Sequence, residues 1–392
     1  WVGRVGRAGS RLVGRVGSCP VSPADGPAGG DFGVYVHVPF CSRRCDYCAF
    51  ATWTDRFHLV DAYVEACVVA ARRRLDPARP ATSVFFGGGT PSLLAPEAVG
   101  RILAAVPVAA GAEITVECNP ESVDRDKLRG YREVGVTRLS FGVQSMVGHV
   151  LASLGRDHAP ESVRRAVEAA GEAGFADSYN VDLIMGAAGE SVDDFASSLD
   201  QVLGLDPPPA HVSAYGLTVE PGTPLAAAPE RHPDPDDQAD KYLLADRRLA
   251  AAGLEWYEIS NWARPGSSCR HNLLYWDQGE YEGIGCAAHS HSVDARTGQA
   301  RRWWNVRTPE RYVKLVGQGG SGESAAEILE PPARRQEALE LALRTRSGVP
   351  KGALPGWGTD ESLDGLVELH GDHLVLTPRG RLLANEVAVR LT

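Results

Sequence analysis

The sequence predicts an α/β fold: a partial barrel of six strand–helix units, followed by a small α+β domain at the C-terminal end. From Gly33 onwards, short apolar runs alternate with longer segments of helical periodicity, and Pro and Gly residues mark the joints. This alternation implies a parallel sheet with crossover helices. A Rossmann fold would share the pattern, but no G-x-G-x-x-G follows the first strand, so the barrel is favoured.

The individual elements follow from this alternation in chain order. Short apolar runs predict strands over residues 33–40, 83–87, 113–118, 137–143, 179–185, 211–217 and 255–260. The longer segments between them predict helices over 57–75, 95–106, 123–134, 160–173, 191–204 and 236–252. Polar residues at the carboxyl ends of the strands are therefore expected to share one rim, where barrels build their sites.

The alternation ends at about residue 265. Residues 266–310 are rich in His, Trp, Tyr and Gly with little periodicity, and residues 316–325 are predicted to be a Gly/Ser-rich linker. A helix over 333–345 and two strands around His370-Gly371-Asp372 then predict the small α+β domain. We expect a disordered tail over 1–30, a barrel over 31–265 and a C-terminal region over 266–392.

The overall composition excludes several classes of protein. The net charge of −10 leaves no basic footprint for nucleic acid, and acidic residues around the C-terminal strands argue against DNA contact there. No apolar run is long enough to span a bilayer, so at most a transient membrane association is expected. The cysteines are scattered except for one group of three, which is typical of a reducing compartment, and we expect a cytoplasmic protein.

That group lies in the segment from Tyr35 to Phe50, directly after the first predicted strand, with the spacing C-x3-C-x2-C. Cys41, Cys45 and Cys48 can converge on one soft metal centre. Three thiolates on a four-iron cluster leave one iron open for a small chelating ligand, such as the amino and carboxylate groups of a methionine. The alternatives are a disulfide or a structural zinc, but zinc needs a fourth His or Cys at a matching spacing, and the upstream His37 is expected to point away from the loop.

This segment resembles the signature of radical S-adenosylmethionine (SAM) proteins, which is C-x3-C-x2-C followed by an aromatic residue. The preceding Tyr-Val-His-Val-Pro-Phe resembles one branch, the oxygen-independent coproporphyrinogen III oxidases and their relative, the heme chaperone HemW. The resemblance extends from about Gly33 to the C-terminus. It implies a partial (β/α)6 TIM-type radical SAM barrel, with a [4Fe-4S] cluster on Cys41, Cys45 and Cys48 and SAM as its ligand.

The resemblance also implies a set of SAM contacts at the strand ends. Three glycines end the second predicted strand in Phe-Gly-Gly-Gly-Thr-Pro, where backbone can approach a ligand closely. A tight turn would be enough to explain these glycines if they stood alone. Here, however, they lie one strand–helix unit after the three-cysteine loop, which favours a ligand contact. The expected contacts to the methionine end are Gly88, Gly89 and Thr90, and Glu117 and Arg156 are expected either there or at a second ligand. Gln144 and Asp182 are expected to contact the ribose or adenine, Gly216 to contact the adenine through its backbone, and Tyr35 and Tyr47 to flank the methionine and adenine.

Two departures from the family pattern are visible. After Asp182-Leu-Ile the family usually has Gly-Leu-Pro or Gly-Thr-Pro, whereas this chain has Met185-Gly-Ala-Ala-Gly-Glu190. Ala49 stands after the third cysteine, where Asp is common. Neither departure removes a ligand of the expected cluster.

A second constellation contains Arg270-His271-Asn272-Leu-Leu-Tyr275-Trp276. An imidazole among aromatic rings can ligate a heme iron, although an aromatic core with hydrogen-bonded imidazoles explains the same residues. The H-N-x-x-Y-W motif resembles one in the heme-chaperone branch, which favours His271 as heme ligand, with Asn272 orienting it. His289 and His291 are the rival ligands.

The choice within the family depends on two features. Coproporphyrinogen oxidases of this family carry a fourth cysteine at the position where this chain has Phe50. They also carry an ordered N-terminal segment over the active site, whereas the corresponding part of this chain is rich in Gly and Arg and is expected to be disordered. Both favour a heme chaperone that delivers heme to an acceptor protein, with no catalytic residues assigned. The rivals are the oxidase itself, which decarboxylates coproporphyrinogen III by a 5′-deoxyadenosyl radical in porphyrin biosynthesis, and a radical SAM enzyme for an unrelated substrate.

Overall fold

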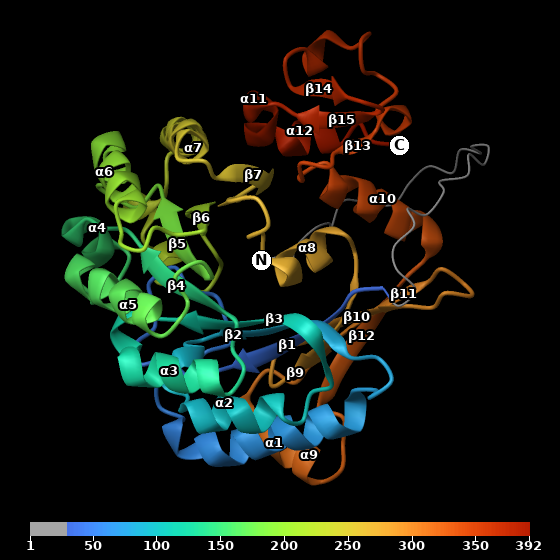
Figure 1. Cartoon of the computed structure of the whole chain (residues 1–392). Helices are drawn as coiled ribbons and strands as arrows, with labels where there is room; N and C mark the ends of the chain where they lie inside the picture. Colours follow the sequence, from blue (N-terminus) through green and yellow to red (C-terminus); the bar gives the residue numbers. More distant parts are fainter. Residues whose placement is uncertain (1–29) are drawn as a thin grey trace.

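A computed structural model describes residues 30–392 and confirms the predicted α/β barrel (Figure 1). The predicted tail over 1–30 lies outside these residues, except for Gly30. Six strands run parallel in chain order: β1 (Phe32–Val38), β2 (Ala81–Gly88), β3 (Val108–Cys118), β4 (Arg138–Gln144), β5 (Tyr179–Met185) and β6 (His211–Gly216). Each matches a predicted strand.

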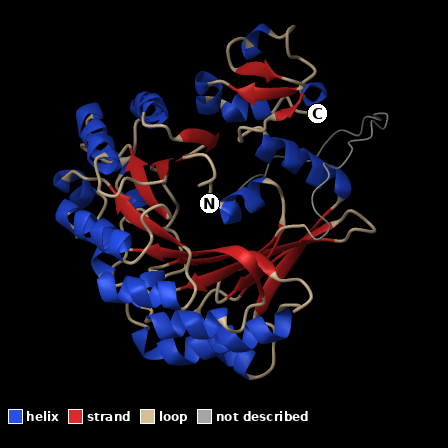
Figure 2. Cartoon of the chain, in the orientation of Figure 1, coloured by secondary structure: helices blue, strands red, loops and turns tan. Residues whose placement is uncertain are grey.

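Helices follow every one of these strands. They are α1 (Val60–Arg74), α2 (Pro96–Leu103), α3 (Arg125–Glu133), α4 (Gly148–Ser153), α5 (Pro160–Glu172), α6 (Val192–Leu203) and α7 (Pro235–Ala251). Figure 2 shows α1 to α6 around the outside of a curved sheet. The short α4 was not predicted, whereas the other six were, because a helix of two turns carries too little periodicity to stand out.

The two faces of β1 show how the barrel divides its side chains. Val34, Val36 and Val38 are fully buried in the core between sheet and helices, together with Tyr63 of α1. The alternate residue Tyr35 points to the inner, concave face, where its ring lies against Phe85 of β2. Strands that are covered on both faces are expected to be apolar, so the polar side chains of the inner face are the ones that need a separate explanation.

The segment after residue 265 differs most from the prediction. It forms α8 (Arg270–Trp276), β9 (Glu280–Ile284), β10 (His289–Val293), β11 (Ala300–Asn305), α9 (Pro309–Gly317) and β12 (Glu323–Leu329). The predicted linker over 316–325 is wrong, because its glycines form only the short turn between α9 and β12. The last predicted strand ends early and splits into the antiparallel pair β7 (Glu255–Glu258) and β8 (Asn261–Ala263).

These strands extend the barrel sheet on both sides. The order is β12-β11-β10-β9-β1-β2-β3-β4-β5-β6-β8-β7, with β9 parallel to β1 and the outer strands antiparallel. In Figure 1, α8 lies in the hollow of the curved sheet, and it contacts β1 and β2. The concave face is therefore lined by β1 to β6, by α8 and by the extension.

The C-terminal end forms a small α+β unit, as predicted. After α10 (Pro331–Ala342) it contains β13 (Val349–Pro350), β14 (Val367–His370), β15 (His373–Leu376), α11 (Pro378–Leu382) and α12 (Ala384–Ala388), with the strand order β13-β15-β14. The predicted hairpin is β14 and β15. The unit has its own hydrophobic cluster around Leu343, Leu374 and Val387. The expected boundaries near residues 30 and 265 stay predictions.

Among residues 30–392, no helix is both long enough and apolar enough to cross a membrane.

Candidate cluster, SAM and heme site

The loop between β1 and α1, residues 39–56, is here named the cluster loop. Two backbone hydrogen bonds close its neck: the Trp53 amide donates to the Pro39 carbonyl over 2.8 Å, and the Cys41 amide donates to the Trp53 carbonyl over 3.1 Å. On its far side the Asp46 carbonyl accepts a 3.0 Å bond from the Leu225 amide, and its carboxylate pairs with Arg231. The cluster loop is therefore fixed at its neck and at its far side. These contacts hold its three cysteines at the rim of the barrel.

The three predicted ligands carry free thiols and lie close to one another. Cys41 is buried, whereas Cys45 and Cys48 are partly exposed. Burial raises the pKa of the Cys48 thiol, and negative charge on Cys45 and Cys41 would raise it further. Three thiolates in this space repel one another unless positive iron lies between them, so the donor set suits a metal cluster.

The arrangement differs from a mononuclear site. In the described part of the chain, no three side chains among His, Cys, Asp and Glu converge closely enough to hold a single metal ion. A four-iron cluster needs no such convergence, because each thiolate binds a different iron. His37 is bonded elsewhere, with Nε2 donating to the Ala51 carbonyl at 2.9 Å and Nδ1 lying 3.1 Å from the Tyr35 hydroxyl.

The glycine motif packs directly against the cluster loop. The Gly89 amide donates to the Val38 carbonyl over 2.7 Å, and the Thr90 amide donates to the Phe40 carbonyl over 2.8 Å. A Cβ atom on Gly89 would lie 2.6 Å from the Phe40 oxygen, so the close approach that requires glycine here is between two protein segments. Thr90 Oγ1 lies 3.4 Å from Cys41 Sγ, which places the motif at the first thiol.

Gly88 connects this motif to the partly buried carboxylate of Glu117. Its φ of +112° lies in a region that favours glycine, and its amide donates to Glu117 Oε2 over 3.1 Å. Burial, with a contribution from the charge of Asp182, raises the pKa of Glu117 to about 8. The group therefore titrates near neutral pH, where a nearby cationic ligand would favour its ionised form.

Asp182 lies on the inner face of β5. Its carboxylate accepts hydrogen bonds from Asn180 Nδ2 at 2.7 Å and from Ser140 Oγ at 3.0 Å. Burial raises its pKa, while these bonds act in the opposite direction. A negative charge on Asp182 raises the pKa of Glu117, so the strand ends place these two predicted acidic groups on the same side of the sheet within electrostatic reach.

Two further predicted residues meet where β4 ends. Gln144 has a φ of +68°, unusual for a residue with a side chain, and the ladder between β4 and β5 shifts register there. Arg156 donates through Nη2 to the Gly142 carbonyl at 2.5 Å, and its Nη1 lies 3.5 Å from Cys45 Sγ. Arg156 therefore joins the end of β4 to the cluster loop with a positive charge beside a thiol.

The last two predicted SAM contacts lie further along the rim. Tyr47 packs against a separate apolar cluster that contains Leu154, Ile184 and Leu217, and burial raises the pKa of its hydroxyl. Gly216 ends β6 next to Leu217, and a Cβ there would lie 3.5 Å from Gln238, an ordinary contact. Tyr47 thus reaches the β5 and β6 side of the rim, opposite the glycine motif.

His271 is placed in an aromatic cluster on the concave face. The residue is 1% exposed, and its ring stacks on Phe85 with the ring centres 5.4 Å apart. Nδ1 lies 2.9 Å from Ser83 Oγ, and Nε2 lies 2.9 Å from the Tyr275 hydroxyl. Burial lowers the pKa of this imidazole to about 3, so it stays neutral, with both nitrogens occupied.

The predicted role of Asn272 is wrong. Its side-chain amide donates to Glu258 Oε1 at 2.9 Å and to the Tyr257 hydroxyl at 3.3 Å, and Ser83 and Tyr275 make the bonds to His271 instead. Tyr275 could have been foreseen, since residues four apart share one side of a helix. Ser83 is 188 positions from His271 in the sequence, and no local pattern indicates that pair.

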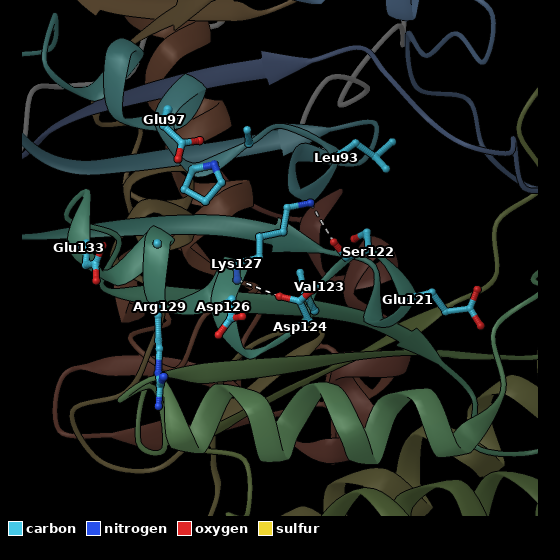
Figure 3. Close-up of a pocket in the computed structure, with 13 residues that line it drawn as sticks. Leu93, Glu97, Glu121, Ser122, Val123, Asp124, Asp126, Lys127, Arg129 and Glu133 are labelled. Carbon is cyan, nitrogen blue, oxygen red and sulfur yellow. Dashed lines mark hydrogen bonds between the residues drawn. The ribbon is translucent and has the colours of Figure 1, made fainter.

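A surface groove between α2 and α3 lies apart from these residues. Figure 3 shows Lys127 within it, and its ammonium donates to the carbonyls of Ser92 and Ser122. The groove is lined by Leu93, Ala95, Pro96, Glu97, Glu121, Ser122, Val123, Asp124, Asp126, Lys127, Arg129, Gly130 and Glu133. None of the predicted site residues belongs to this lining.

Comparison with known proteins assigns this chain to a family. The model of the Radical SAM superfamily matches residues 35–202. The chain is 42% identical to the heme chaperone HemW of Mycobacterium tuberculosis (strain ATCC 25618 / H37Rv), over 92% of this chain and 94% of that protein. It is 34% identical to the heme chaperone HemW of Escherichia coli (strain K12), over 90% of this chain and 96% of that protein.

A solved structure at lower sequence identity shares the fold. The structure of coproporphyrinogen III oxidase (HemN) from Escherichia coli aligns with a TM-score of 0.77 at 22% identity, and covers 92% of this chain and 89% of that one. That likeness concerns the fold alone, whereas the sequence identities extend along nearly the whole chain. The chain therefore belongs to the radical SAM superfamily and, within it, to the heme chaperone HemW family.

Proposed function

We propose that this chain is a heme chaperone that binds a [4Fe-4S] cluster, SAM and heme, and passes heme to an acceptor protein. The observation that carries the proposal is the near full-length identity to proteins named heme chaperone HemW, in a chain whose three thiols gather beside the glycine motif. Phe50 supports this choice over the oxidase. This residue is 51% exposed, and it stands at the position where the oxidases of this family carry a fourth cysteine.

In this proposal Cys41, Cys45 and Cys48 each hold one iron of the cluster. The bound cluster supplies one iron without a protein ligand, to which SAM can bind. Thr90 and the Gly88–Glu117 pair form the wall for the methionine end of SAM, with Gly89 holding that wall against the cluster loop. Arg156 balances negative charge beside Cys45.

The remaining SAM contacts are proposed along the rim. Asp182 and Gln144 are proposed to bind the ribose or adenine, Gly216 to contact the adenine through its backbone, and Tyr35 and Tyr47 to flank the ligand. Heme is proposed to bind on the concave face near α8, where His271 was the predicted ligand. An exposed iron–sulfur cluster would require a reducing compartment, and we propose the cytoplasm.

The test is anaerobic reconstitution with iron and sulfide, followed by parallel assays with heme and with coproporphyrinogen III. We expect about four irons per chain, an absorbance band at about 400 nm and heme binding without formation of the decarboxylated product. Replacing Cys41, Cys45 and Cys48 together by Ala should abolish the band. The matched control is Cys67→Ala, since Cys67 is a buried thiol of α1.

Each assay has an outcome against the proposal. Stoichiometric zinc in place of iron would contradict the cluster, and robust formation of the decarboxylated product would identify the oxidase. A reconstituted protein that takes up no heme would rule out the chaperone and leave the cluster assignment standing.

A further inference from the structure

The connection between β6 and α7, residues 217–234, lies against the cluster loop and is here named the β6–α7 segment. It contains two short 3₁₀ turns and folds on itself, with Nε2 of His232 3.1 Å from the Leu225 carbonyl. Leu225 is 3% exposed and belongs to the apolar cluster on which Tyr47 of the cluster loop packs. A long connection that packs on its own residues is usually functional.

Asp46 is the residue of the cluster loop that receives this segment. Its carbonyl accepts the 3.0 Å bond from the Leu225 amide, and its Oδ2 accepts a 2.8 Å bond from Arg231 Nη2. Its own amide donates to the Leu154 carbonyl, just after α4, over 3.4 Å. Gly155 leaves room for the carboxylate, because its φ is +71° and a Cβ there would lie 2.9 Å from Asp46 Oδ1. Asp46 is therefore held from the β6–α7 segment and from the end of α4 at once.

Arg231 joins these two supports. The Nη2 atom that pairs with Asp46 also donates to the carbonyl of Ser153, the last residue of α4, over 2.5 Å. The side chains of the ion pair are only 28% and 32% exposed, so water screens the pair less than it would on an open surface. Hydrogen bonds from a charged group are stronger than those between neutral groups. One guanidinium thus fixes the position of Asp46 relative to α4.

The position of Asp46 matters because this residue stands between two of the three predicted cluster ligands, Cys45 and Cys48. Cys41 is held separately, by the neck of the cluster loop and beside Thr90. A displacement of Asp46 would therefore move the two partly exposed thiols and leave the buried one in place.

We propose that the β6–α7 segment holds Cys45 and Cys48 in position for the cluster, with Arg231 as the positioning residue that acts through Asp46. This inference rests on the proposed [4Fe-4S] cluster. The coupling is reciprocal: what the closed segment adds to cluster retention, the bound cluster adds to closure of the segment. Because parts of the segment, such as Pro221 and Gly222, are exposed, the presence of the cluster becomes detectable at the protein surface.

The first test measures how long the reconstituted protein keeps its iron in an excess of an iron chelator without oxygen. Arg231→Ala should lose iron at least about tenfold faster than the unmodified protein, since two hydrogen bonds from a charged group are gone. Arg231→Lys keeps the charge without the planar guanidinium and should fall between the two. The matched control is Arg43→Ala, which removes a cluster-loop charge whose pair with Asp157 is long and exposed, and which should retain iron normally.

Further measurements distinguish positioning of the thiols from a general loss of stability. Combining Asp46→Asn with Arg231→Ala should be no worse than the more damaging single change, because both break one contact. The electron paramagnetic resonance spectrum of the reduced cluster should shift in Arg231→Ala, while the melting temperature of the cluster-free protein stays nearly unchanged. In the unmodified protein, amide hydrogen exchange over residues 217–234 should be slower with the cluster than without it.

The outcomes separate this inference from the proposed function. If the unmodified protein takes up no cluster, both fail. If the cluster forms but Arg231→Ala keeps its iron and its spectrum, the role of Arg231 is overturned and the proposed function stands. Equal iron loss in Arg43→Ala would also overturn that role, and amide exchange that ignores the cluster would overturn the coupling. Should Arg231→Ala fail to fold, Arg231→Lys and Asp46→Asn provide the same comparison.

Discussion

Among single residues, Glu117 shows how burial changes the pKa of a carboxyl group at the proposed ligand site. The pKa of this carboxyl is raised to about 8 by burial, although the Gly88 amide stabilises the charged form. Its neighbour Asp182 opposes ionisation further. SAM carries a positively charged sulfonium, so a carboxylate of this kind can exchange a proton for a cationic ligand at physiological pH.

The first prediction concerns the stability of the unliganded protein against pH. The folded-state pKa of Glu117 lies above the usual value of 4.5, so its contribution to stability is complete below 4.5 and is lost as pH rises through about 8. Compared with Glu117→Gln, the unmodified protein should lose at least about 1.4 kcal/mol of unfolding free energy across this window, the equivalent of one pKa unit.

Thermal or denaturant melting of both proteins at a series of pH values measures this difference. Asp182→Asn serves as the control, since removing that charge should lower the pH at which the loss occurs without abolishing it. A difference between the two proteins that stays constant from pH 4.5 to 8 would contradict the assignment.

Single residues also show which features of the site can be predicted from sequence and which cannot. The spacing of Cys41, Cys45 and Cys48 identifies the cluster loop because all three ligands lie in one short segment. The partners of His271 come from β2 and from its own helix, and only the second is encoded locally. His289 lies beside Trp304 because β10 pairs with β11, and the sequence pattern did not reveal that pairing.

Among the elements, the contact between the cluster loop and the glycine motif determines the site. The ends of β1 and β2 are joined by backbone bonds from Gly89 to Val38 and from Thr90 to Phe40. The motif therefore supports the loop that carries Cys41, in addition to any contact with SAM. This dual role changes what a substitution in the motif should do.

The second prediction is that Gly89→Val lowers cluster content and SAM binding together. A Cβ at this position would lie 2.6 Å from the Phe40 oxygen and 2.8 Å from the Val38 oxygen, and both are backbone atoms that cannot rotate away. Overpacking of this kind typically costs about 1–3 kcal/mol, and displacement of the cluster loop relieves it. Iron content, absorbance and SAM affinity after reconstitution measure the effect.

Gly216→Ala is the matched control on the same rim. There the added carbon meets only Gln238 at 3.5 Å, so cluster content should remain at the level of the unmodified protein. If Gly89→Val retained a full cluster and lost only SAM, the glycine would serve the ligand alone, and the structural role assigned to it would be wrong.

The elements that were predicted and those that were missed differ in physical character. The strand–helix units from β1 to α7 have long amphipathic or apolar patterns. Such patterns can be recognised within a short window of sequence, so they predict these strands and helices well. The strands β9 to β12 are five to seven residues long, and β11 and β12 contain Arg, Glu and Trp whose order follows pairing with distant strands. The glycines after α9 indicated a break in helix but not that a strand follows.

For the whole molecule, the two larger hydrophobic cores have to be held together. The large core lies between the barrel sheet and its outer helices, and the small one lies in the C-terminal unit. Arg381 of α11 joins them: it pairs with Asp246 of α7 at 2.7 and 3.2 Å and lies 4.2 Å from the ring of Trp256. Its side chain is only 8% exposed, so the pair is largely desolvated.

The third prediction is that Arg381→Ala loosens the C-terminal unit from the barrel. The change leaves the carboxylate of Asp246, which is 16% exposed, without its guanidinium partner, while the 2.9 Å bond from Trp262 Nε1 stays intact. Breaking a largely desolvated pair of this kind costs about 3 kcal/mol. We expect a lower melting temperature, a transition that separates into two, and earlier proteolytic release of a C-terminal fragment.

Two variants sharpen this test of how the two cores are joined. Arg379→Ala removes a neighbouring charge that is exposed, and it should leave melting and proteolysis unchanged. Arg381→Lys keeps the charge but loses the two-pronged contact with the carboxylate, so its effect should fall between the other two. Because the residues proposed to bind the cluster and SAM lie on the barrel, Arg381→Ala should keep its iron content. A single unshifted melting transition in Arg381→Ala would show that other contacts, such as the bridge between Glu258 and Thr345, hold the C-terminal unit in place.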